Sequence, residues 1–185
     1  MSTFREIADI KTADVLDLDV PEVERHNVLT KPSEQQKDIL AGLAERAEIV
    51  RSGAVDPSKD NMLKITNDGR KLALDQRLIN PMLPDFEGSK LNACADNIFS
   101  LWDKTKEDRL AQMVFCDLST PDGAGKFNVY DDLKEKLIAK GIPENEIAFI
   151  HDAKTNQQKQ DIFSQVRSGK IRVIIGSTSK MGAGT

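Results

Sequence analysis

Cysteine and histidine are both scarce in this chain of 185 residues, which contains only two of each. Cys94 and Cys116 lie in apolar segments with no histidine near them in the sequence, so they make a poor metal site. We expect both to be buried free thiols, as is usual in a reducing cytosol. The two histidines, His26 and His151, are too few for most zinc chemistry.

Long apolar runs are missing as well. No stretch approaches the ~18 consecutive apolar residues that a transmembrane helix needs. The first residues, "MSTFREIADIKTADVLDL", contain no apolar core of a secretory signal. Hydrophobic residues make up 39% of the chain and charged residues 30%, which is ordinary for a globular protein. We therefore expect a cytoplasmic protein with no membrane partner.

The residue patterns of several catalytic sites are also absent. The segment "DGAGK" (122–126) does not match the phosphate-loop pattern G-x-x-x-x-G-K-[ST], because Thr120 and Phe127 stand where glycine and a hydroxyl residue are required. No strand end carries the Asp-Glu pair that would hold magnesium, and no Ser-His-Asp or Cys-His arrangement is recognisable. We expect "DGAGK" to be a flexible loop and this chain alone to be catalytically inactive.

Charge, in contrast, is plentiful and unevenly distributed. The net charge is −4, and residues 1–85 carry 12 basic against 16 acidic residues. From residue 154 onward the only acidic residue is Asp161, and the basic residues are Lys154, Lys159, Arg167, Lys170, Arg172 and Lys180. A basic end of this kind suits a polyanion, whereas the plain alternative is a solvated surface.

The first 85 residues show helical patterns and little strand pattern. Ser33 and Gln36 form a capping box, apolar residues then recur at helical spacing, and Gly53 marks the end of that helix. A shorter helix is expected within 68–80, ending before Pro81. We place a domain boundary near residue 85, after a mainly helical linker region.

The second half, residues 86–185, alternates between helices and strands. Helices are expected within 89–106, 128–140 and 155–168, with Asn128 and Thr155 as N-caps and Gly141 and Gly169 as stops. Short apolar runs predict strands at 112–117, 147–151 and 171–176. Alternation of this kind predicts an α/β fold, a parallel sheet with flanking helices.

Small polar residues follow each predicted strand. Ligands of open parallel sheets bind beyond the carboxyl ends of the strands, and hydroxyls and backbone N–H groups suit phosphate oxygens there. The candidate residues at these strand ends are Ser119, Thr120, Lys154, Thr155, Ser177, Thr178 and Lys180. Each hydroxyl residue taken singly is equally typical of a turn, and His151 beside Asp152 is expected to be structural.

Several segments, taken in order, resemble the C-terminal RecA-like lobe of a superfamily 2 helicase or translocase. The likeness is to Swi/Snf-type ATPases and to related helicases of phages and conjugative elements. It runs through "PSEQQ", "LALDQRLINP" and "GSKLNACADNIF", then "QMVFCDLST" as motif four, and residues 149–185 as motifs four-a and five. The family often has glycine where Ala153 and Met181 stand.

The resemblance implies a RecA-like fold and a role in a two-lobe motor. The strand-end residues would contact DNA phosphates without reading bases, and Gly182 and Gly184 would lie near a nucleotide between the lobes. ATP and magnesium would be bound mainly by the N-terminal RecA-like lobe of the parent chain, and none by this fragment alone. The chain ends inside motif five, so we expect it to be a fragment of a longer ATPase.

Two other hypotheses remain open at this stage. The chain could be a stand-alone α/β module that binds a nucleotide or a phosphate without motor activity. A third, weaker hypothesis is a protein-interaction role for the acidic helical half.

Overall fold

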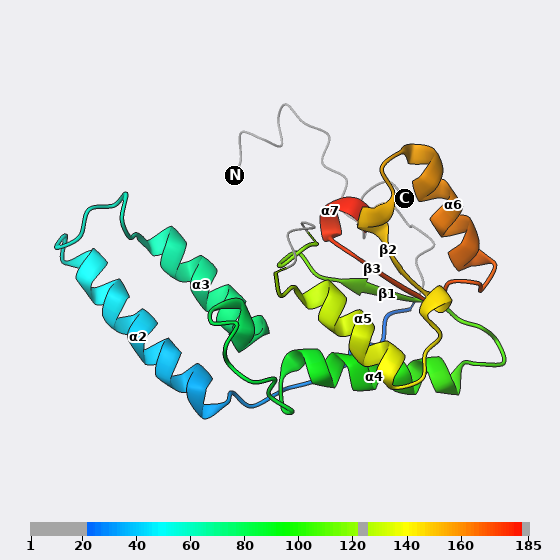
Figure 1. Cartoon of the computed structure of the whole chain (residues 1–185), viewed down its shortest axis with the longest axis horizontal. Coiled ribbons are helices and arrows are strands. Elements are labelled where there is room, and N and C mark those ends of the chain that lie inside the picture. The colour runs from blue at the N-terminus through cyan, green and yellow to red at the C-terminus, as the bar shows by residue number, and fades with distance from the viewer. Residues whose placement is uncertain (1–21, 122–125, 183–185) are drawn as a thin grey trace, which may run out of the picture.

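The computed structural model describes residues 22–121 and 126–182 (Figure 1). Most of the predicted "DGAGK" loop and the predicted nucleotide contact Gly184 lie outside the described residues. The described helices and strands are, in chain order, α2 (Glu34–Arg51), α3 (Met62–Leu74), η1 (Gln76–Leu78), α4 (Lys90–Lys104), β1 (Gln112–Phe115), α5 (Val129–Ala139), η2 (Glu144–Glu146), β2 (Ile147–Phe149), η3 (Ile150–Asp152), α6 (Asn156–Arg167), β3 (Val173–Gly176) and α7 (Thr178–Met181).

The three strands form one parallel sheet in the order β1-β3-β2. Phe115 of β1 pairs with Gly176 of β3, and Phe149 of β2 pairs with Ile175, so the three strands end almost level. The predicted α/β fold with a small parallel sheet and flanking helices is therefore confirmed. Each strand is slightly shorter than the sequence predicted. The RecA-like assignment itself stays a prediction.

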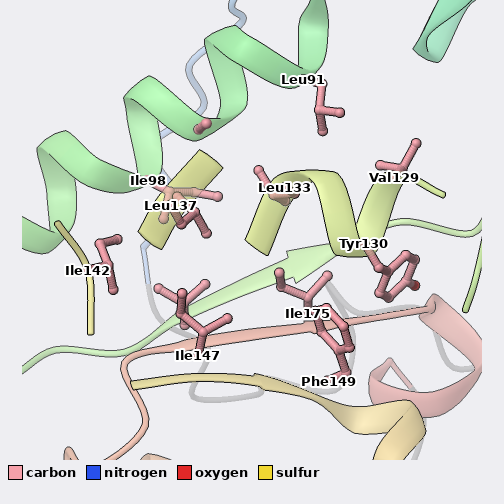
Figure 2. Close-up of a cluster of buried hydrophobic side chains, with 12 residues drawn as sticks. Leu91, Ile98, Val129, Tyr130, Leu133, Leu137, Ile142, Ile147, Phe149 and Ile175 are labelled. Atoms are coloured by element: carbon pink, nitrogen blue, oxygen red, sulfur yellow. The ribbon is translucent and has the colours of Figure 1, made fainter. Parts of the chain in front are cut away.

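Helices cover the two faces of this sheet. Alternate side chains of β3 point in opposite directions: Val173 and Ile175 pack with α4 and α5, whereas Ile174 packs with α6. Figure 2 shows the larger core, in which Leu133 and Leu137 of α5 face the strands. The chain leaves β1 through α5 and leaves β2 through α6, so right-handed crossovers in opposite directions place these helices on opposite faces.

Helices α2 and α3 form a hairpin beside the sheet layers (Figure 1). Its small core consists of Leu43, Ile65 and Leu72. The predicted capping box is present, since the Ser33 hydroxyl accepts from the Gln36 N–H and the Gln36 side chain accepts from the Ser33 N–H. The predicted stop is also present, because Gly53 adopts φ +73°, a conformation that glycine reaches without strain.

Helix α3 differs from its prediction. It begins at Met62, where the Asn61 side chain accepts from the Lys64 N–H, and it ends at Leu74. Asp75 is extended, and its carboxylate accepts from the Arg77 N–H to start η1. The apolar pattern alone did not reveal this break between α3 and η1. The break depends on the Asp75 carboxylate, which is buried in the folded chain.

A buried ion cluster connects η1 with α5. The Arg77 guanidinium lies 2.8 Å from Asp75 and 3.0 Å from Asp132 of α5, and it stacks over the Phe127 ring at 4.3 Å. These contacts cross the predicted boundary at residue 85, which itself stays a prediction. Among the described residues, no helix is long and apolar enough to cross a membrane.

Candidate functional site

The segments that follow the three strands meet at one edge of the sheet. We call this edge, formed by residues 116–120, 150–155 and 177–182, the carboxyl edge. Because the strands are parallel and end level, all of the predicted strand-end residues that the structure describes belong to it. Figure 1 shows α7 at this end of the sheet, where it also contacts η3.

Asp117 connects the segments after β1 and β3. Its carboxylate accepts hydrogen bonds from the Thr178 N–H at 2.6 Å and from the Thr178 hydroxyl at 2.8 Å. These two bonds, together with the charge of Arg70 on α3, hold the pKa of Asp117 below its usual range. The sequence analysis missed Asp117, which places a negative charge at an edge expected to receive phosphates.

Ser119 holds the beginning of α5. It has φ +57°, and its hydroxyl oxygen lies 3.0 Å from the Val129 nitrogen, whose N–H it accepts. The hydroxyl thus satisfies one of the N–H groups that a helix start leaves unpaired. Thr120, the next residue, is exposed. A hydroxyl that accepts still has one O–H to donate, so Ser119 can also contact an anion.

Thr155 plays the same part at the start of α6. Its hydroxyl accepts from the Gln158 N–H at 3.2 Å, and the Gln158 side chain accepts from the N–H groups of Thr155 and Lys154. The N-cap predicted at Thr155 is therefore confirmed, and Gln158 completes a capping box there. Two backbone N–H groups that face this edge are consequently occupied by a protein side chain.

Two further predicted residues have structural contacts at the carboxyl edge. Ser177 is buried, and its hydroxyl lies 3.0 Å from that of Ser179. Gly182 ends α7, where its N–H donates to the Thr178 carbonyl and where an added Cβ would lie 2.7 Å from that oxygen. Local packing is thus a sufficient reason for glycine at 182.

His151 lies at the carboxyl edge in η3, directly after the outer strand β2. Its ring meets the Tyr130 ring of α5 edge-on at 5.4 Å, and its Nε2 lies 3.4 Å from the Tyr130 hydroxyl, which donates to the Cys116 carbonyl. The Lys154 ammonium donates to the His151 carbonyl at 3.1 Å. Tyr130 and His151 therefore join the ends of β1 and β2.

The pKa of His151 is lowered, first by burial and then by the positive charge of Lys180. Lys154 lowers it further, whereas Asp152 opposes the shift. The folded state favours neutral His151, so the imidazole contributes to stability above the ordinary histidine pKa of ~6.5. This contribution is lost as the pH falls from that value through the lowered pKa of the folded state. Two lysines from different strand ends thus act on one imidazole.

The arrangement predicts how the imidazole responds to a charge change. We expect Lys180→Glu to raise the pKa of His151, because the variant replaces a repelling cation by an attracting anion. The C2-proton signal of His151 in an NMR pH titration measures this directly. Lys170→Glu, before the amino end of β3, makes the same charge change away from the carboxyl edge and serves as control. A His151 titration unchanged by Lys180→Glu would contradict the geometry.

The two cysteines are free and half-buried, packed against the larger core. Burial raises the pKa of both thiols, which keeps them protonated. In the described ranges, no three histidine, cysteine or acidic side chains gather as metal ligands would. Comparisons with protein families, curated proteins and solved structures found no match to this chain.

Proposed function

We propose that this chain is the second lobe of an ATP-dependent DNA helicase or translocase and that its carboxyl edge contacts DNA phosphates. The observation that carries the proposal is the position of Lys154 and Lys180, which follow two different strands whose ends lie at the same edge of the sheet. Both lysines are exposed. Such a pair of ammonium groups on one edge suits a polyanion backbone.

The hydroxyl residues refine this picture. Ser119 and Thr155 accept hydrogen bonds from helix starts and keep an O–H to donate, whereas the Thr178 hydroxyl donates to Asp117. The proposed contacts are therefore the ammonium groups of Lys154 and Lys180 with the hydroxyls of Ser119, Thr120 and Thr155 in support. None of these groups distinguishes one base from another, so binding is independent of sequence.

Affinity is expected to be low. Asp117 repels phosphate beside Thr178, and the whole chain carries a net charge of −4. With about two to four phosphates neutralised, the log–log salt slope is about −2 to −4, and the dissociation constant is ~10⁻⁴ M or weaker at physiological salt. A partner lobe of the same parent chain supplies the main binding groups for ATP and magnesium in this proposal.

The DNA contact can be tested by titrating a fluorescent oligonucleotide at low salt. We expect Lys180→Glu to weaken binding roughly fivefold or more, since one ion pair in water is worth about 1 kcal/mol. The salt slope should become shallower by about one, equally for different sequences. Lys170→Glu is again the control, since Lys170 lies before the amino end of β3.

Three outcomes would count against the proposal. Equal loss of binding in both variants would show that overall charge, rather than the carboxyl edge, attracts DNA. A strong preference for one base sequence would contradict a phosphate contact. Inorganic phosphate or a mononucleotide could also displace the oligonucleotide completely when its concentration equals that of the DNA phosphate groups. That result would favour the alternative, a stand-alone α/β phosphate-binding module.

A further inference from the structure

A separate pocket, which is open to solvent and is called the cavity below, lies between the hairpin and the start of α4. Leu40 in its lining is 59% exposed. The volume of the cavity is about 230 Å³, and its apolar surface comes from Leu40 of α2 and from Gly69, Leu72 and Ala73 of α3. Its lining includes two exposed lysines, Lys31 and Lys90, the second of which is the first residue of α4, and we call the part of the cavity beside them its mouth. Known small-molecule sites are mostly ~300–1,000 Å³ and largely apolar, so this cavity suits a smaller organic molecule.

The walls of the cavity are held by hydrogen bonds between elements distant in sequence. The Gln36 side chain donates to the Leu72 carbonyl at 2.8 Å, which fixes α2 against α3. The Ser33 hydroxyl donates to the Gln76 side chain at 2.6 Å, and Gln76 donates to the Pro84 carbonyl. A cavity built in this way exists before a ligand arrives, which lowers the entropic cost of binding.

The charge around the cavity has one sign. Lys31, Lys37 and Lys90 line it, and no acidic side chain does so among the described residues. Lys37 pairs with Glu34 at 2.7 Å, although Glu34 is 80% exposed and not part of the lining. The Ser89 hydroxyl accepts from the Asn92 N–H and keeps one O–H to donate, whereas the positive charge comes from the lysines.

We infer that this cavity binds a small organic anion that has one compact apolar body and one carboxylate or phosphate group. The apolar body lies against Leu40, Leu72 and Ala73, and the anionic group lies at the mouth between Lys31 and Lys90. Since an apolar cavity of about 150 Å³ is known to bind benzene, a volume of about 230 Å³ matches an aromatic ring with one small substituent.

Benzoate is the probe that fits this description, and NMR is the readout. We expect benzoate to shift the backbone amide signals of Gly69, Leu72 and Ala73 in a saturable way, with a dissociation constant in the millimolar range usual for a ligand of this size. Benzyl alcohol has the same ring and no charge, so it should bind at least about threefold more weakly. Inorganic phosphate has no apolar body and should leave these amides unchanged.

Variants separate the two parts of the site. Ala73→Leu fills the cavity from an exposed helical position that accepts leucine, and we expect it to abolish the shifts while circular dichroism stays unchanged. The double variant Lys31→Gln/Lys90→Gln should weaken benzoate about threefold or more and leave benzyl alcohol unaffected. Lys104→Gln, at the other end of α4, is the matched control and should behave like the unaltered chain.

The inference is overturned by any of three results: shifts that rise linearly without saturation, equal affinity for benzoate and benzyl alcohol, or benzoate binding that survives Ala73→Leu. Each can be distinguished from failure of the DNA proposal, because the cavity residues are not part of the carboxyl edge. Saturable binding that is lost in Ala73→Leu and weakened by the double lysine variant supports it.

Discussion

Arg77→Ala is expected to lower the free energy of unfolding by about 3–5 kcal/mol, as is typical when one partner of a buried ion cluster is removed. The side chain of Arg77 is 10% exposed and that of Asp75 only 2%. Burial alone would lower the pKa of Arg77, but its hydrogen bonds to Asp75 and Asp132 raise it. Without the guanidinium, the buried Asp75 carboxylate has no cation beside it, whereas Asp132 and Asp85 keep Lys136 as a partner.

Urea unfolding monitored by circular dichroism measures this loss. Arg51→Ala is the matched control, because Arg51 forms an exposed i,i+3 pair with Glu48 in the last turn of α2. Its expected cost is below about 0.5 kcal/mol. If Arg77→Ala cost no more than Arg51→Ala, the cluster would not be the connection between η1 and α5 that we describe.

Arg172→Ala is expected to have a comparable effect, about 3–5 kcal/mol, for a different reason. The Arg172 side chain is 1% exposed, and its guanidinium donates to the Trp102 carbonyl at 2.6 Å, to the Thr105 hydroxyl at 3.0 Å and to the Leu110 carbonyl at 3.3 Å. These bonds are only partly buried, so each lost bond costs about 1 kcal/mol. The lost packing over the Trp102 ring adds to this.

The same unfolding experiment tests this prediction, with tryptophan fluorescence as a local readout because the chain has a single tryptophan. Burial is the main reason that the pKa of Arg172 is lowered, and Glu146 at 3.9 Å only partly opposes it. Arg167→Ala, on an exposed position in the last turn of α6, should stay within about 0.5 kcal/mol of the unaltered chain. A similarly small loss for Arg172→Ala would contradict its burial.

The ends of most helices could be predicted from the sequence. Ser33 with Gln36 forms the predicted capping box, and Thr155 is the predicted N-cap of α6. Gly53, Gly141 and Gly169 all have positive φ where the sequence placed helix stops. These features are predictable because capping and left-handed turns depend on residues within one helical turn of each other. The central strand β3 was predictable for a related reason, since a strand buried on both faces reads as a continuous apolar run. Strand β1 is apolar although one of its faces, with Met113 and Phe115, is exposed.

The hydrogen-bond partners of the strand-end residues were not predictable in this way. The sequence placed the hydroxyls and lysines at the strand ends, and parallel pairing brought those ends to one edge. Whether a hydroxyl was available there depended on partners far along the chain. Thr178 meets Asp117 from 61 residues away, and His151 meets Tyr130 from 21 residues away.

By itself, then, the sequence determined most helix ends, the strands, the parallel sheet and the set of polar residues at its carboxyl edge. Each of these depends on local spacing and on a general rule of chain connection. Only the tertiary structure decided that Asp117 binds Thr178, that Arg77 joins η1 to α5 and that lysines surround a cavity beside α4. These features arise from side chains that meet only after the chain has packed, and spacing along the sequence carries no information about such distances.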